Sequence, residues 1–156
     1  MAQQLPPLDE ATFQSVEALK QNPVIAKALQ LALEETDFAM QEQIEICEIP
    51  SPTFEEGTRA NEIAKRMRQY GLQDVHIDEI GNVVGKLPGT ANGPVVAFGA
   101  HMDTVFSMDT PIHVTQEGNI YRAPGIGDNA SGLRALLQTI RCFMKFDIKP
   151  QGDICL

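Results

Sequence analysis

The chain has 156 residues with 43% hydrophobic content, and its 21 acidic and 12 basic residues give a formal net charge of −9 at pH 7. This length is sufficient for one domain with a sizeable core. The negative charge argues against binding to nucleic acid or to an anionic membrane surface. No segment reaches the roughly 18 apolar residues of a membrane span, and the first ten residues lack the features of a signal peptide, so we expect a cytoplasmic protein.

The first 50 residues are predicted to be helical. Apolar residues recur at helical intervals over residues 9–19 and again over 25–47, which predicts one short helix followed by one or two longer ones. Residues 49–52 (Ile-Pro-Ser-Pro) form a loop, because each proline removes a backbone donor and disfavours helix in its predecessor. We therefore expect residues 1–50 to be a helical segment that packs on a body formed by residues 51–156.

Another helix is predicted directly after this loop. Thr53 and Glu56 match the spacing of a capping box, and apolar side chains recur at helical intervals over residues 60–67. Gly71 then supplies the stop. In this interpretation the adjacent acids Glu55 and Glu56 provide negative charge at the start of the helix, and they are not a catalytic pair.

Beyond the helix the hydrophobic period changes to that of strands. Residues 75–77 alternate with polar neighbours, Gly81 and Asn82 provide turn chemistry, and residues 83–87 form the second arm of a predicted hairpin. The run over residues 95–100 is continuously apolar. Such a run predicts a strand buried on both faces, at the centre of a parallel sheet under helices.

The last third of the chain adds one helix and the beginning of a strand. Residues 130–146 carry apolar side chains at helical spacing, and residues 152–156 read as a strand that the chain enters but does not finish. The order of elements predicts an α/β fold with a mixed, largely parallel sheet flanked by helices. We expect this fold to be truncated.

A histidine and an aspartate stand two positions apart where the apolar strand ends. On extended backbone, His101 and Asp103 face the same way. A metal-binding imidazole needs its second nitrogen held, and a nearby carboxylate can hold it, so His101 is a candidate ligand and Asp103 its orienter. Sites in open α/β sheets form at the carboxyl ends of strands. The structural alternative is a histidine that closes a hydrogen bond at a strand end, beside an aspartate that caps a turn.

A glycine-rich loop precedes the last helix. Asp128 lies in this loop, where its carboxylate could bridge two divalent ions. The alternative is an ordinary helix N-cap, a frequent role of aspartate at this position. Residues 125–130 also match G-x-G-x-x-A, the dinucleotide fingerprint, but residues 121–124 are a poor buried strand to precede it.

The two motifs together resemble those of the co-catalytic zinc M20 metallopeptidases, which include tripeptidases, dipeptidases and deacylases of N-acyl amino acids. The motifs are GAHMDTV at residues 99–105 and GIGDNASG at 125–132, and the resemblance extends from Thr36 to the end. It implies a zinc-exopeptidase-like fold and a site with two Zn²⁺ ions, with other divalent metals as alternatives. His101 would bind one ion, Asp103 would orient His101 as the catalytic candidate, and Asp128 would bridge both ions. A cis peptide bond often follows the bridging aspartate.

The later parts of the family pattern have no match in this chain. These are a Glu-Glu pair that supplies the general base and a ligand, a further acidic ligand, a distant histidine and an inserted dimerisation domain. His76 and His113 lie outside both motifs, and we expect them to be surface residues. A complete form would hydrolyse a peptide or an N-acyl amino acid and could be a homodimer, whereas we expect this chain alone to be inactive.

Two other function classes stay open at this point. One is a non-catalytic interaction module that uses the same fold without metal. The other is a nucleotide-dependent oxidoreductase, which would rest on the G-x-G-x-x-A match alone.

Overall fold

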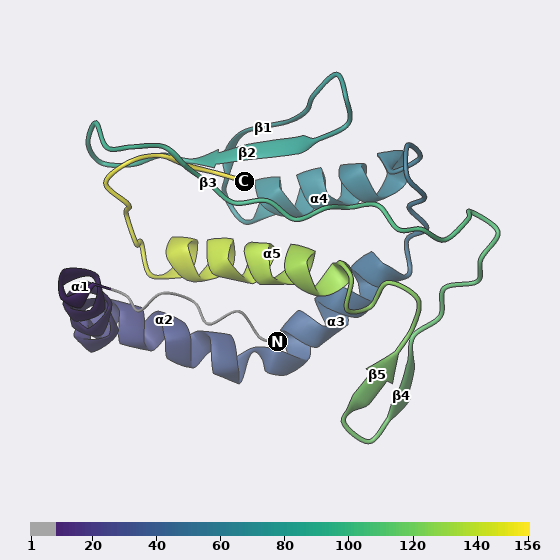
Figure 1. The fold of residues 1–156 in the computed structure, drawn as a ribbon, viewed down its shortest axis with the longest axis horizontal. Helices are drawn as coiled ribbons and strands as arrows, with labels where there is room; N and C mark the ends of the chain where they lie inside the picture. Colours follow the sequence, from purple (N-terminus) through teal and green to yellow (C-terminus); the bar gives the residue numbers. More distant parts are fainter. Residues whose placement is uncertain (1–8) are drawn as a thin grey trace.

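The computed structural model describes residues 9–156, which form helices and strands in the predicted order (Figure 1). The helices are α1 (Glu10–Gln21), α2 (Pro23–Glu34), α3 (Thr36–Cys47), α4 (Gly57–Gln69) and α5 (Ala130–Lys145). The strands are β1 (Gln73–Ile77), β2 (Val83–Leu87), β3 (Val96–Ala97), β4 (Thr115–Glu117), β5 (Ile120–Arg122) and β6 (Ile154–Cys155).

The main sheet is mixed, with the strand order β1-β2-β6-β3. Strands β1 and β2 form the predicted antiparallel hairpin, β2 pairs antiparallel with β6, and β6 pairs parallel with β3. The last strand in the sequence therefore lies between two earlier ones. Strands β4 and β5 form a separate hairpin, which projects from the far end of the molecule (Figure 1). The predicted α/β fold with a mixed sheet and flanking helices is confirmed, although the sheet was expected to be largely parallel and two of its three pairings within residues 9–156 are antiparallel.

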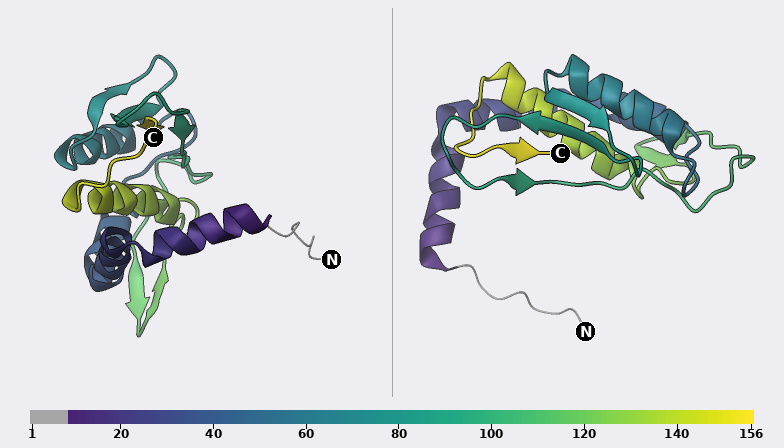
Figure 2. Two further views of the ribbon diagram at one scale, coloured as in Figure 1. Left: turned by 90° about the vertical axis from the view of Figure 1, so that its left-hand side faces the viewer. Right: turned by 90° about the horizontal axis from the view of Figure 1, so that it is seen from above.

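Helices cover one side of the sheet in two layers (Figures 1 and 2). α4 packs against β1 and β2, and α5 lies beside α4, with α2 and α3 on its other side. The core between these layers contains Ile46, Ile63, Leu133 and Leu137, all of which are buried. Because α3 contributes to the same core as α4 and α5, the helices before residue 50 pack closely on the rest of the chain. The division at residue 50 stays a prediction.

The prediction for the apolar run 95–100 is wrong in two respects. Only Val96 and Ala97 form a strand, and that strand lies at the edge of the sheet. Its side chains are exposed, and so are those of Val95 and Phe98. The physical reason is that β3 pairs on one side only, with β6, among residues 9–156. The rest of the run continues as irregular chain towards His101.

The predicted capping box is also wrong, although the helix exists. α4 begins at Gly57 with Glu56 as its N-cap, and no side chain caps it. The Thr53 hydroxyl donates instead to Asp103, and a Glu56 carboxylate oxygen accepts from the backbone N–H of Phe54. Glu56 therefore does supply charge at the helix start. The helix begins three residues later than the capping box requires, and the Thr53 hydroxyl bonds to Asp103, a residue distant in sequence.

The remaining expectations concern the chain ends and surface. α1 packs on α2 and buries none of its side chains. His76 and His113 are both exposed, as predicted; His113 forms an ion pair with Glu48. None of the helices within residues 9–156 is long and apolar enough to cross a membrane.

Candidate metal centre

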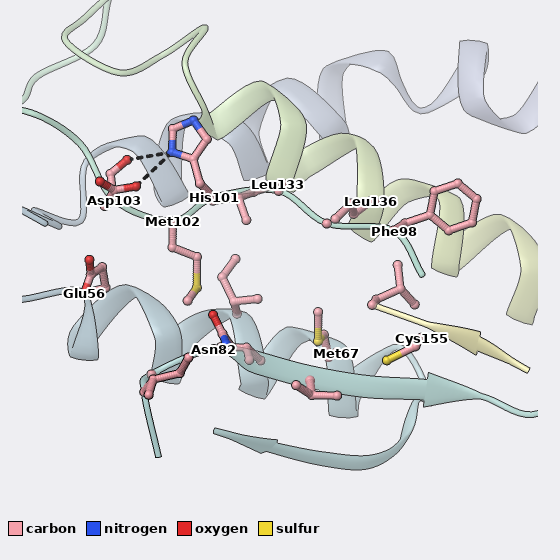
Figure 3. Close-up of a pocket in the computed structure, with 18 of the residues that line it drawn as sticks. Glu56, Met67, Asn82, Phe98, His101, Met102, Asp103, Leu133, Leu136 and Cys155 are labelled. Atoms are coloured by element: carbon pink, nitrogen blue, oxygen red, sulfur yellow. Dashed lines mark hydrogen bonds and ion pairs between the residues drawn. The ribbon is translucent and has the colours of Figure 1, made fainter. Parts of the chain in front are cut away.

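His101 stands between the two predicted carboxylates. It follows β3 and lies where the chain leaves the sheet. Its Nδ1 atom lies 3.0 Å from Oδ1 of Asp103 and 3.2 Å from the Asp103 carbonyl oxygen. Figure 3 shows the His101 ring turned towards Asp103, whereas Met102 points the other way, into a cleft. This alternation is what extended backbone produces, and it lets one residue serve the site while its neighbour packs inside.

Asp128 reaches the same histidine from the loop before α5. Its Oδ1 atom lies 2.8 Å from His101 Nε2, and the next side chain, Asn129, donates from Nδ2 to the His101 carbonyl oxygen at 3.3 Å. The Asp128–Asn129 peptide bond is cis, as the family resemblance implies. Gly132 packs so closely on the Asn129 side chain that a Cβ atom would overlap it. The two motifs, 25 residues apart from Asp103 to Asp128 in sequence, therefore meet at one place.

The alternative role of Asp128 as an ordinary N-cap is not observed. The N-cap of α5 is Asn129, and no side-chain hydrogen bond caps this helix. The Asp128 side chain is 90% exposed, and the His101 ring is 52% exposed. The carboxylate therefore faces open space with His101 as its neighbour, as a ligand would.

Both carboxylates change the protonation of the histidine. Burial lowers the pKa of His101, but the hydrogen bonds that the ring makes to the carboxylates of Asp128 and then Asp103 outweigh it, and the pKa lies above its ordinary value. The pKa of Asp103 lies below its ordinary value, first because the Thr53 hydroxyl donates to it and then because of the His101 ring. Asp103 is therefore an ionised acceptor behind the ring, which is the state required to orient a metal-binding imidazole.

The donor set fits a divalent metal such as zinc but does not complete its coordination. An imidazole Nε2 and a carboxylate oxygen converge, and a second carboxylate holds Nδ1, an arrangement typical of zinc-binding histidines. Within residues 9–156, no group of three or more histidine, cysteine, aspartate or glutamate side chains is placed to hold one ion. Protein zinc sites usually have at least three protein ligands. The described residues thus offer two candidate ligands and one orienting group.

The structure adds two residues that the sequence analysis missed. Thr53 donates to the outer oxygen of Asp103, and the buried guanidinium of Arg59 donates to the carbonyl oxygen of Met102. Both residues precede His101 by more than 40 positions. The only signal in the sequence was the Thr53-x-x-Glu56 spacing, which pointed to a different role.

His101 and Asp103 also line one end of a cleft of about 690 Å³ (Figure 3). Its walls are formed by the start of β2, by Gly57, Ile63 and Met67 of α4, by the chain from Ala97 to Asp103 and by Leu133 and Leu136 of α5. Asp128 does not line this cleft. The histidine therefore stands at the rim, between the cleft and the exposed carboxylate.

Comparisons with known proteins point to hydrolases. The family model described as Peptidase family M28 matches residues 82–156. A putative [LysW]-lysine/[LysW]-ornithine hydrolase from Pyrococcus abyssi is 38% identical over 93 residues, which cover 60% of this chain and 26% of that protein. A protein of the same description from Pyrobaculum aerophilum is 33% identical over 112 residues, or 72% of this chain and 30% of that protein. The chain thus spans less than a third of these relatives.

Solved structures of peptidases share the fold. Aminopeptidase PepT from Bacillus cereus superposes with a TM-score of 0.64 and 25% identity, over 75% of this chain and 34% of that chain. A tripeptidase from Staphylococcus aureus gives a TM-score of 0.63 with the same identity and coverage. A dinuclear metal-binding peptidase of the M20 family from Bacillus subtilis has the fold at 14% identity, with a TM-score of 0.57 and coverage of 76% and 33%. The fold is therefore that of a part of these peptidases.

Proposed function

We propose that this chain supplies His101 and Asp128 to the two-zinc centre of an enzyme that hydrolyses amide bonds, with a peptide or an N-acyl amino acid as substrate. The observation that carries the proposal is the convergence of the two side chains at 2.8 Å, with Asp103 behind the histidine. His101 would hold one ion through its Nε2 atom, and Asp128 would be the ligand that the two ions share. Other divalent metals are alternatives, because the donors alone do not select zinc.

Each residue has a definite task in this chemistry. Asp103 holds the Nδ1–H, so that the lone pair of Nε2 is free for a metal. Bound zinc ions would lower the pKa of a water between them and polarise the substrate carbonyl group. Asp128 places negative charge at an exposed position, which favours divalent cations. We assign no general base among the described residues, and we therefore propose that the chain alone does not turn over substrate.

Two findings support the finer assignment to an M20-type enzyme. The motifs at residues 99–105 and 125–132 lie in the order and at the separation of that family, and the structure brings them together. Two solved proteins of similar fold are named an aminopeptidase and a tripeptidase, activities of the kind that the resemblance implies. The match to the M28 family model supports the broader class of peptidases.

The activity can be tested in a chimera. The 93-residue segment of this chain that matches the Pyrococcus abyssi hydrolase would replace its counterpart there, and purified, folded chimera would be assayed against di- and tripeptides and N-acetyl amino acids. We expect hydrolysis that a chelator abolishes and that zinc restores. Replacing His101 or Asp128 by alanine should remove it, and His76→Ala is the matched control. A folded chimera whose activity survives His101→Ala would overturn the assignment.

The nucleotide-binding alternative is weakened by the topology. The dinucleotide fingerprint requires a strand of the main sheet directly before the glycine loop. Here the loop follows β5, which pairs with β4 in the separate hairpin. The non-catalytic alternative makes a different prediction for the chimera, because a module that uses no metal would be indifferent to His101→Ala.

A further inference from the structure

The loop before α4 lies alongside the segment that carries the candidate centre. The backbone N–H of Thr104 donates to the Ser51 carbonyl oxygen at 2.7 Å, and Pro52 and Thr104 form a parallel bridge. Ser51 and Thr104 are both buried. Residues that are about 50 positions apart in the sequence therefore form one frame around Asp103, which lies between Met102 and Thr104.

Two side chains of this frame act on Asp103 from different directions. Thr53 Oγ1 donates to Asp103 Oδ2 at 2.7 Å, while the other carboxylate oxygen faces His101 Nδ1 at 3.0 Å. Arg59 is 1% exposed, and its Nη1 atom donates to the Met102 carbonyl oxygen at 2.7 Å. Thr53 thus fixes the rotation of the carboxylate, and Arg59 fixes the backbone from which that carboxylate extends.

The bonding of Arg59 is unusual for a buried guanidinium. Its Nη2 atom also donates to the carbonyl oxygens of Cys47, at 3.2 Å, and Ile49, at 2.5 Å. Arg59 therefore joins the end of α3, the loop after it and the Met102 peptide. Burying a charged group is costly unless its hydrogen bonds are made. The two Nη atoms bond to three separate segments, whereas the buried Nε atom has no partner among the described residues.

We propose that Thr53 and Arg59 are positioning residues of the candidate metal centre, which hold Asp103 so that its Oδ1 atom keeps a proton on His101 Nδ1 and leaves Nε2 free. The inference rests on the proposed function for its purpose, but its structural part concerns the metal-free chain. Without Thr53, the carboxylate can rotate, and Asp128 then competes for the single proton of the neutral ring through Nε2. The proton of the neutral ring would then move from Nδ1 to Nε2, which is the nitrogen that a metal needs.

The test compares Thr53→Val with Thr53→Ser, because Thr53 is exposed and its replacement should leave the fold intact. In the metal-free chain, ¹⁵N NMR of the neutral imidazole reports which nitrogen carries the proton. We expect Thr53→Val to shift the population from Nδ1–H towards Nε2–H, and Thr53→Ser to restore it. Zinc alone is the second probe, and we expect about tenfold weaker binding for Thr53→Val, as for other groups that orient metal ligands. Thr58→Val, an exposed threonine in α4, is the matched control.

Arg59→Lys is tested in the same way, with thermal unfolding measured alongside. If Arg59→Lys unfolds, the comparison of Thr53→Val with Thr53→Ser still tests whether these residues position Asp103. Unchanged proton populations in Thr53→Val would overturn the inference, whether or not zinc binds. If the populations shift as expected but zinc binding by the chimera does not depend on His101, the proposed function fails while the positioning role of Thr53 stands.

Discussion

At the scale of single residues, His101 determines what the site can do, because each ring nitrogen faces a different carboxylate. Its folded pKa is raised, so the two hydrogen bonds favour the imidazolium form. Their contribution to stability is fully present below the unfolded pKa and is lost as pH rises through the folded pKa. A metal needs the neutral ring, so protons compete with it in the same range of pH.

We predict that His101 in the metal-free chain titrates above its ordinary value of 6.5. Asp128→Asn should lower the His101 pKa, because it removes the strongest interaction that raises it, the hydrogen bond with the Asp128 carboxylate, together with that carboxylate's charge. The measurement is an NMR titration of the ring protons, with the signal assigned through His101→Ala. A value at or below 6.5 in the unaltered chain would contradict the geometry described here.

The cysteines provide an independent check on the packing. Cys47 and Cys142 are buried, and burial raises the pKa of both thiols, whereas Cys155 is partly exposed. Since the thiolate is the reactive form, we predict that a disulfide reagent modifies Cys155 first and the other two only as the chain opens. Cys155→Ser should remove the fast phase. Three equal rates would show that the core is not packed as described.

At the scale of the elements, α4 ends at a left-handed backbone conformation that favours glycine, and Gly71 occupies it. Gly71 has a φ of 93°, its N–H donates to Arg68, and the next N–H, of Leu72, donates to Met67. This is a Schellman motif. The predicted end of the helix at Gly71 is confirmed. A Cβ atom at Gly71 would lie 2.7 Å from Cε of Met144.

We therefore predict that Gly71→Ala lowers the free energy of unfolding by about 1–2 kcal/mol, the cost of left-handed backbone for a residue with a Cβ atom. Gly57→Ala is the control, since it is the first residue of the same helix and a Cβ atom there meets nothing within 4 Å. Urea unfolding measures both. Equal midpoints for the two variants would contradict the prediction.

A charged cluster joins α3 to α4 inside the molecule. Arg66 contacts Glu42 at 3.0 Å, Glu45 at 2.8 Å and Glu62 at 2.8 Å, and the Glu42 side chain is only 1% exposed. The Tyr70 hydroxyl also donates to Glu42. Removing the cation would leave a buried carboxylate without its counter-charge.

We predict that Arg66→Met lowers the free energy of unfolding by about 3–5 kcal/mol, the range for one broken partner of a buried ion pair. Lys65→Met, which removes an exposed lysine that also contacts Glu62, should change it by less than about 1 kcal/mol. Chemical denaturation distinguishes them. A loss for Arg66→Met no larger than that for Lys65→Met would show that the cluster does not stabilise the fold.

Sequence patterns predicted those elements whose causes are local. The helices over 130–146 and 60–69, the hairpin with its Gly81–Asn82 turn and the stop at Gly71 all follow from neighbouring residues. The patterns failed where a residue distant in sequence determines the local structure or the hydrogen-bond partner. Thr53 has the spacing of a cap, yet Asp103 takes its hydroxyl, and the apolar run at 95–100 lacks a second neighbouring strand among the described residues.

At the scale of the whole molecule, the fold brings the two motifs together through a helix and a sheet edge. His101 comes from the chain after β3, and Asp128 comes from the loop before α5. Because α5 packs beneath the sheet that contains β3, the end of that strand and the start of that helix lie close together (Figure 1). His101 and Asp128 could be predicted as a pair because one motif follows a strand and the other precedes a helix. The groups that hold Asp103 were not, since Thr53 and Arg59 belong to a different part of the chain.

We propose that His101 and Asp128 together hold a divalent metal in the complete centre, and zinc titration of the folded chimera that carries the matching segment of this chain measures whether they do. The measurement is the dissociation constant for zinc, with the His101 ring nitrogens followed by NMR in the same samples. We predict a saturable change at Nε2, no such binding in His101→Ala, at least about tenfold weaker binding in Asp128→Asn and no change in His76→Ala. Equal zinc affinity with and without the His101→Ala change would show that His101 does not bind the metal.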